Sequence, residues 1–153
     1  MRQPSLVEPM EGFLFSGATR FRDAYLATDY IVRDGRREFA LRPGVRDPRI
    51  SRLLTRFRAR SAAFITAFNP YSLSRGPIVN EWAHRRLVNE LRERGIAFLD
   101  GHGRGLSGDW PSERSVLAFG LSKSAAAAIG RRLRQNAIVF VRRETSTELL
   151  MLR

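Results

Sequence analysis

The chain has 153 residues, a length that favours one domain and allows about 70% of the unfolded surface to be buried. It contains no cysteine, which excludes disulfides, thiolate catalysis and cysteine-based metal sites. The formal net charge of +12 predicts attraction to polyanions, nucleic acid first. However, all but one of the 27 basic residues are arginine, which coding in a GC-rich genome would also produce.

Composition also bears on location and cofactors. No apolar run approaches the roughly 20 residues that span a bilayer, and residues 1–17 lack the continuous apolar core of an export signal. We therefore expect a cytoplasmic protein that has no membrane association. The two histidines, His84 and His102, match no metal-ligand spacing, so neither a metal site nor another cofactor is expected.

Residues 1–20 show no sustained hydrophobic period and are interpreted as an N-terminal arm, followed by a single domain over residues 21–153. The alternation from Asp23 to Val32 predicts a strand. Asp34-Gly35 indicates a hairpin turn, and Glu38 to Leu41 supplies the return strand.

A helix is predicted to open at Asp47-Pro48, with aspartate as the N-cap and proline at the first helical position. Its apolar residues follow the i, i+3, i+4, i+7 spacing of one buried face. The opposite side carries Arg49, Arg52 and Arg56, within the most basic segment of the chain. Two interpretations stay open for these arginines: a solvated helix face or an anion-binding face.

The stretch from Ala62 to Pro70 is a short apolar run that ends in Asn-Pro, a pattern typical of a strand buried on both faces with a sharp exit. A second helix is predicted from Ile78 to Arg94, with Gly95 as its C-cap. The apolar residues expected on its buried side are Val79, Trp82, Ala83, Leu87 and Leu91.

The remaining elements are expected in the order strand, glycine loop, strand, helix, strand, strand. They comprise strands at Ile96–Leu99 and Arg114–Leu121, a mobile loop at Gly101–Gly108, a helix capped by Ser122, and strands at Ala137–Val141 and Glu148–Leu152. Together the elements follow the order β-β-α-β-α-β-β-α-β-β. This order predicts an α+β fold, with a mixed β-sheet and about three packed helices.

Candidates for chemistry are few. The glycine segment fits neither the dinucleotide-binding pattern nor the P-loop pattern, although its amides and Arg104 could hold an anion. His102, between two glycines, and Glu113, just before a buried strand, are the candidates for proton transfer because their pKa values can be tuned. A flexible connection and a salt bridge to a nearby arginine are their respective structural alternatives.

Polar residues follow the ends of several predicted strands, where pockets in proteins of this kind tend to form. We predict that they share one cleft beside the glycine segment. The candidate ligand-binding residues are Asn69, Ser72, Asn80, Arg104, Trp110, Ser115 and Gln135. For Asn69 a purely structural role in the turn is the alternative, since an unpaired buried amide would cost about 1–3 kcal/mol.

Several motifs occur together in one order: Tyr25-x-x-Thr-x-Tyr30, Ala63-Phe-Ile-Thr-Ala-Phe-Asn-Pro70, Asn80, Trp110-x-x-Glu113-x-Ser115 and Gln135-Asn136-Ala137. This order resembles an uncharacterised bacterial family, domain of unknown function 3293, over about residues 22–142. The resemblance implies that Asn69, Asn80, Trp110, Glu113, Ser115 and Gln135 belong to one recurrent pattern, and it implies no activity or cofactor. The chain departs from the pattern at Gly76–Val79, where acidic residues are usual.

Three functions follow as hypotheses. The charge favours an anion-binding module for nucleic acid or another phosphate-bearing ligand. The first alternative is an enzyme of unknown reaction whose cleft lies at the strand ends and the glycine segment. The second is an interaction domain without a pocket, whose protein partner the sequence does not identify.

Overall fold

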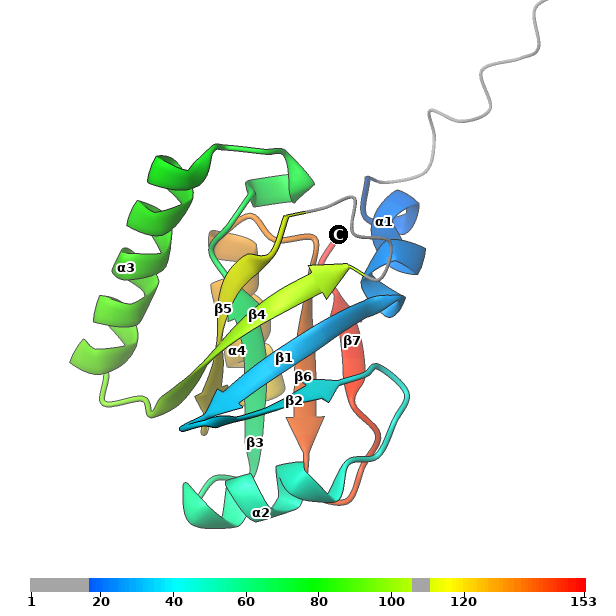
Figure 1. Ribbon diagram of the computed structural model, residues 1–153, viewed down its shortest axis with the longest axis vertical. Coiled ribbons are helices and arrows are strands. Elements are labelled where there is room, and N and C mark those ends of the chain that lie inside the picture. Colours follow the sequence, from blue (N-terminus) through cyan, green and yellow to red (C-terminus); the bar gives the residue numbers. More distant parts are fainter. Residues whose placement is uncertain (1–16, 106–110) are drawn as a thin grey trace, which may run out of the picture.

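The computed structural model describes residues 17–105 and 111–153, with side chains from residue 21 onward (Figure 1). The elements are α1 (Gly17–Leu26), β1 (Thr28–Asp34), β2 (Arg37–Leu41), α2 (Pro48–Arg56), β3 (Ser61–Thr66), the 3-10 turn η2 (Pro70–Ser72), α3 (Pro77–Glu93), β4 (Phe98–Gly105), β5 (Glu113–Phe119), α4 (Lys123–Arg132), β6 (Ala137–Arg142) and β7 (Glu148–Met151). Within the described part of the chain, no helix is both long and apolar enough to span a bilayer.

From β1 onward the helices and strands follow the predicted order, so the α+β class is confirmed. The strands form one seven-stranded sheet in the order β2-β1-β4-β5-β3-β6-β7. All neighbouring pairs are antiparallel, which corrects the mixed sheet expected from the sequence. The helical crossovers do join strands of the same direction, but an antiparallel strand lies between the two strands that each crossover connects.

The centre of the sheet is a β-α-β-β-α-β unit. The α3 crossover from β3 to β4 leaves room for β5 between them, and the α4 crossover from β5 to β6 leaves room for β3. This arrangement is the split βαβ, ferredoxin-like motif. The β1–β2 hairpin extends the sheet beside β4, and β7 extends it beside β6.

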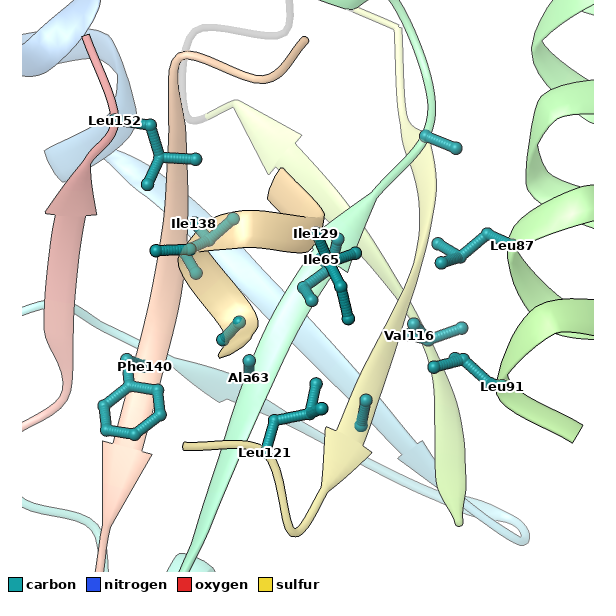
Figure 2. Close-up of a cluster of buried hydrophobic side chains, with 14 residues drawn as sticks. Ala63, Ile65, Leu87, Leu91, Val116, Leu121, Ile129, Ile138, Phe140 and Leu152 are labelled. Carbon is teal, nitrogen blue, oxygen red and sulfur yellow. The ribbon is translucent and has the colours of Figure 1, made fainter. Parts of the chain in front are cut away.

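Helices cover both faces of the sheet. On one face, α3 and α4 pack against β3, β5 and β6, burying a cluster that includes Ile65, Leu87, Val116, Ile129 and Phe140 (Figure 2). On the other face, α2 contributes the apolar spacing predicted from the sequence and buries Ile50, Leu53 and Leu54. Asp47 caps α2 as predicted, accepting a hydrogen bond from the Arg49 amide at 2.9 Å.

The sheet is strongly curled, so that β1 and β2 cross in front of β3 and β6 (Figure 1). The segment after β2 reaches the β6–β7 turn, where Gly44 N lies 2.8 Å from Thr147 O and Thr147 N lies 2.9 Å from Val45 O. Inside the curl, the rings of Tyr30 and Phe64 meet edge to face, with centroids 5.4 Å apart. The inner face of the sheet is therefore the wall of a partly closed barrel.

Gly101, on the inner face of β4, permits this curl. A Cβ at Gly101 would lie 2.5 Å from the Ile31 carbonyl oxygen and 2.8 Å from the Phe64 ring. The expectation of a loop over Gly101–Gly108 is thus wrong for residues 101–105, which form the end of β4, and the rest of that segment lies outside the described residues. Glycine is used here because a neighbouring backbone and ring approach closely.

Two further expectations need correction. The strand predicted from Asp23 begins only at Thr28, because the preceding residues form α1, in which Phe21 and Tyr25 lie one turn apart with ring centroids 6.2 Å from each other. In α3, Val79 and Trp82 are exposed and Asn80 and His84 are buried. The helix faces the sheet with these polar residues because Asn80 pairs with Asn69, a contact that hydrophobic periodicity does not reveal.

Candidate functional site

A cavity of about 450 Å³ opens inside the curl of the sheet, between α1 and the inner faces of β1, β3, β4, β5 and β6. We call it the α1 cavity. Its walls are Phe21, Ala24, Tyr25, Ala27, Thr28, Tyr30, Phe64, Thr66, Asn69, Ser72, Gly103, Gly105, Glu113, Ser115, Gln135, Ala137, Ile138, Val139 and Leu149. Most of the surface is apolar or aromatic, and no basic side chain is among the described residues that line it.

The structure brings together most of the residues that the sequence placed in one cleft. Asn69, Ser72, Ser115 and Gln135 line the α1 cavity, and so does Glu113. They come from the ends of β3, β5 and α4 and from η2, segments far apart in the sequence. Asn80 lies directly behind Asn69 and supports it rather than forming part of the wall.

Asn69 is the centre of a buried polar network. Its side-chain Nδ2 donates to Glu113 Oε1 at 2.8 Å. Its Oδ1 accepts from Asn80 Nδ2 at 2.8 Å and from the Arg75 amide at 3.1 Å, while its own backbone N–H donates to Asn80 Oδ1 at 2.9 Å. Asn69 therefore has the structural role in the turn considered from the sequence, and its side chain also holds a carboxylate at the cavity wall. Its contact with a ligand stays a prediction.

The local backbone explains why an asparagine stands at this position. Asn69 adopts the left-handed conformation, with φ of 45°, and Pro70 then begins η2. Asparagine tolerates this conformation better than most residues because its short amide can hydrogen-bond locally. The turn is also tied to the end of α4, since Gln135 Nε2 donates to the Phe68 carbonyl at 3.0 Å and the Tyr71 amide to the Arg134 carbonyl at 2.7 Å.

Tyr25 and Tyr30 add two hydroxyl groups to the wall, and Asn136, which is not a lining residue, supports Tyr25 from behind. The hydroxyls of Tyr25 and Ser72 lie 2.6 Å apart, and Asn136 Nδ2 donates to the Tyr25 hydroxyl at 3.0 Å. Tyr30 donates to the Tyr25 carbonyl at 2.7 Å. Burial, aided by the charge of Glu113, raises the pKa of Tyr30, so its hydroxyl stays protonated and remains a donor.

Several predicted residues lie elsewhere. His102 and Arg104 alternate along β4 with Gly103 and Gly105, which line the α1 cavity, so their side chains emerge on the opposite face of the sheet. Arg104 lies 3.6 Å from Asp29, a buried carboxylate that Arg42 also contacts at 3.0 Å.

The two candidates for proton transfer, His102 and Glu113, are thus on different faces of the sheet. Trp110 lies outside the described residues.

The three arginines proposed as an anion-binding face lie on α2. Two of them have carboxylate partners: Arg49 contacts Asp47 at 2.7 Å and Arg56 contacts Asp34 at 2.8 Å. Their guanidinium hydrogen bonds hold the pKa values of Asp47 and Asp34 below the usual range. Arg52 is exposed and makes no ion pair with any residue that the structure describes. The charge of this helix face is therefore largely compensated within the chain.

Residues 65–138 match the model of the family described as protein of unknown function DUF3293. The resemblance seen in the sequence is confirmed for this segment, whereas its part before residue 65, with the Tyr25-x-x-Thr-x-Tyr30 motif, stays a prediction. No significant match is found among curated proteins or among solved structures. The matched DUF3293 segment runs from β3 to the start of β6 and contains Asn69, Asn80, Glu113, Ser115 and Gln135, whereas α1 and β1, which also line the α1 cavity, lie before it.

Sequence reasoning missed the aromatic wall. Tyr25, Tyr30 and Phe64 belong to the motifs that carry the DUF3293 resemblance, yet none was selected as a site residue. Aromatic residues within a predicted strand are ordinarily assigned to the hydrophobic core. What distinguishes Tyr25 is a hydroxyl that requires a partner, and it finds one in Ser72, a residue 47 positions away.

Proposed function

We propose that the α1 cavity binds a small, largely apolar or aromatic molecule that carries a protonated amine or a similar hydrogen-bond donor. The observation that carries this proposal is a roughly 450 Å³ cavity lined mainly by apolar and aromatic residues, with one carboxylate, Glu113, held at its wall by Asn69. This volume lies within the range of about 300–1,000 Å³ typical of small-molecule sites.

The chemistry of the wall sets the preferred charge of the ligand. Glu113 is the only carboxylate among the described lining residues, and no arginine or lysine accompanies it there. Tyr25, Tyr30 and Phe64 also line the cavity, and an aromatic ring attracts a cation over its face by about 0.5–1 kcal/mol where exposed and about 2 kcal/mol where desolvated. Among the described lining residues an anion would meet a carboxylate and no basic side chain, so the phosphate-bearing ligand expected from the overall charge suits this cavity less well.

The test uses three probes of similar shape and different charge: tryptamine, indole and indole-3-propionate. We expect tryptamine to raise the melting temperature most and indole-3-propionate least. Glu113→Gln keeps the size of the side chain and removes its charge, and should weaken tryptamine binding by about tenfold or more, because a hydrogen bond to a charged group contributes about 1.5–3 kcal/mol. Binding of neutral indole should change little in this variant.

The matched control is Glu38→Gln, which removes a carboxylate from the exposed ion pair of β2 with Arg33. It should leave the affinity for tryptamine unchanged. Equal affinity of the wild-type protein for tryptamine and indole-3-propionate, or equal losses in the two variants, would contradict the proposal.

A further inference from the structure

The outer face of the sheet carries a second concavity with the opposite charge. A groove of about 400 Å³ lies where α3 packs against β4 and β5. We call it the α3 groove. The residues that matter for its chemistry are His84, Arg85 and Arg92 from α3, Phe98 and Asp100 from β4, and Arg114 from β5.

Three guanidinium groups border the α3 groove, against a single lining carboxylate, that of Asp100. Arg114 also contacts Glu81 at 2.7 Å. Arg85 and Arg92 make no ion pair with any residue in the described ranges, unlike Arg49 and Arg56 on α2. The charges of Arg85 and Arg92 are therefore not compensated by an ion pair within the described residues, whereas that of Arg114 is.

A second observation concerns the polar group beneath the groove. His84 is only 2% exposed, and neither of its ring nitrogens has a hydrogen-bond partner among the described residues. A buried polar group without a hydrogen-bond partner is unfavourable, and it calls for an explanation, for instance a role in ligand binding. The edge of the Phe68 ring contacts His84 at 6.2 Å between centroids and offers it no hydrogen bond.

We propose that the α3 groove binds the phosphate group of a small molecule, between Arg85, Arg92 and Arg114. Planar guanidinium groups match the oxygens of a phosphate in paired hydrogen bonds, and several of them favour a dianion over a single carboxylate. Arg92 lies over the ring of Phe98, another lining residue, with its guanidinium carbon 5.8 Å from the ring centre. Asp100 and Glu81 would repel an extended polyanion, which favours a small ligand over nucleic acid.

The α3 groove is independent of the α1 cavity, although one strand borders both. Glu113 and Arg114 are consecutive in β5, so they point to opposite faces of the sheet. Glu113 lines the α1 cavity and Arg114 lines the α3 groove. Failure of one proposal therefore leaves the other intact.

The experiment is a calorimetric titration of the full-length protein with pyrophosphate at low ionic strength. The double variant Arg85→Gln/Arg92→Gln should raise the Kd at least tenfold. The control, Arg49→Gln/Arg52→Gln, removes the same charge from α2 and should change the Kd less than about twofold. Both pairs of arginines lie on helix surfaces. The melting temperature of each double variant checks that it is folded, and each should bind tryptamine as the wild-type protein does.

Three outcomes would overturn the proposal. The first is the absence of pyrophosphate binding by the wild-type protein. The second is an equal loss in the two double variants, which would indicate diffuse attraction. The third is tighter binding of single-stranded DNA that both variants weaken alike, which would indicate a polymer-binding surface. A change in the imidazole ¹⁵N shifts of His84 on adding pyrophosphate would support the site directly.

Discussion

The α1 cavity and the α3 groove lie on the two faces of one strand and differ in almost every physical respect. The α1 cavity is mainly apolar and aromatic and contains a carboxylate, whereas the α3 groove is bordered by three guanidinium groups. The change from Glu113 to Arg114, a single step along β5, reverses the sign of charge between them. Overall net charge therefore says little about the charge of a particular site, because strand alternation distributes neighbouring residues to opposite surfaces.

The cavity also depends on features of the fold that the groove does not need. It exists because the sheet curls, and the curl depends on close approach at Gly101. Its carboxylate is positioned by a buried amide network, whereas the arginines of the groove project from a helix surface and a strand end. Substitutions at the cavity should thus affect stability as well as binding, and those of the exposed arginines Arg85 and Arg92 at the groove should affect binding alone.

The largest expected effect is at the inner face of β4. Gly101→Val should destabilise the fold by more than about 3 kcal/mol, since its side chain would collide with the Ile31 carbonyl and the Phe64 ring. The matched control is Gly103→Ala, because a Cβ at Gly103 meets only the Thr28 methyl, at 3.8 Å. Denaturant melts compare the two variants, and equal losses would refute the role given to Gly101.

The next effect concerns Asn69. Asn69→Gly should cost about 2 kcal/mol by removing the side-chain hydrogen bonds that Asn69 makes with Asn80 Nδ2 and Glu113 Oε1, and Asn69→Ala about 1 kcal/mol more because alanine resists the left-handed backbone. Both variants should lose tryptamine affinity, as the carboxylate is no longer fixed. Chemical denaturation gives the stabilities; if alanine were tolerated as well as glycine, backbone conformation would not be what selects asparagine.

A smaller effect is expected from acid. Burial, and to a smaller extent the charge of Arg114, lowers the pKa of His84. The charges of Glu81 and Asp100 oppose this shift. The unfolded chain takes up a proton near pH 6.5 and the folded chain resists it, so stability should fall as the pH drops below 6.5, by at most about 1.4 kcal/mol per pH unit. His84→Leu should flatten this part of the stability profile, and an unchanged slope would argue against a buried neutral imidazole.

The smallest effect should come from the ion pairs of α2. Arg56→Gln removes an exposed pair with Asp34 and should cost less than about 1 kcal/mol. High salt should reduce the difference further, because solvent-exposed charges are screened. Melting curves at two salt concentrations measure this difference in stability. A loss of stability as large as that from Asn69→Ala would contradict the small contribution expected of an exposed ion pair.

Local chemistry explains how much of this molecule could be predicted. The Asp34-Gly35 turn, the Asp47 and Ser122 caps and the Gly95 terminus are decided by neighbouring residues, and each was found where expected. The burial of Asn80 and His84 was not, because it depends on the rotation of α3, which a distant partner sets. The strand character of Gly101–Gly105 was missed for a similar reason, as it depends on the Phe64 ring across the curl.

The same distinction applies to the site. Four of the seven polar residues predicted to bind a ligand line the same cavity, since strand ends gather at the rims of a sheet, and their binding of a ligand stays a prediction. His102 and Arg104 were expected beside these residues, but they lie on the opposite face of the sheet. The sequence predicted a loop for this segment, and only its true strand structure decides on which face each side chain lies. The aromatic wall from α1 and β1 required knowledge of the curl.

The account as a whole is tested most directly by mapping both ligands on one protein sample with amide ¹H–¹⁵N spectra. Tryptamine should shift signals around Asn69, Gly103 and Ser115, whereas pyrophosphate should shift a separate set around Arg85, Asn89 and Asp100. Shifts by both ligands at the same residues, or weak shifts spread over the whole surface, would contradict two sites of opposite charge on the faces of one sheet.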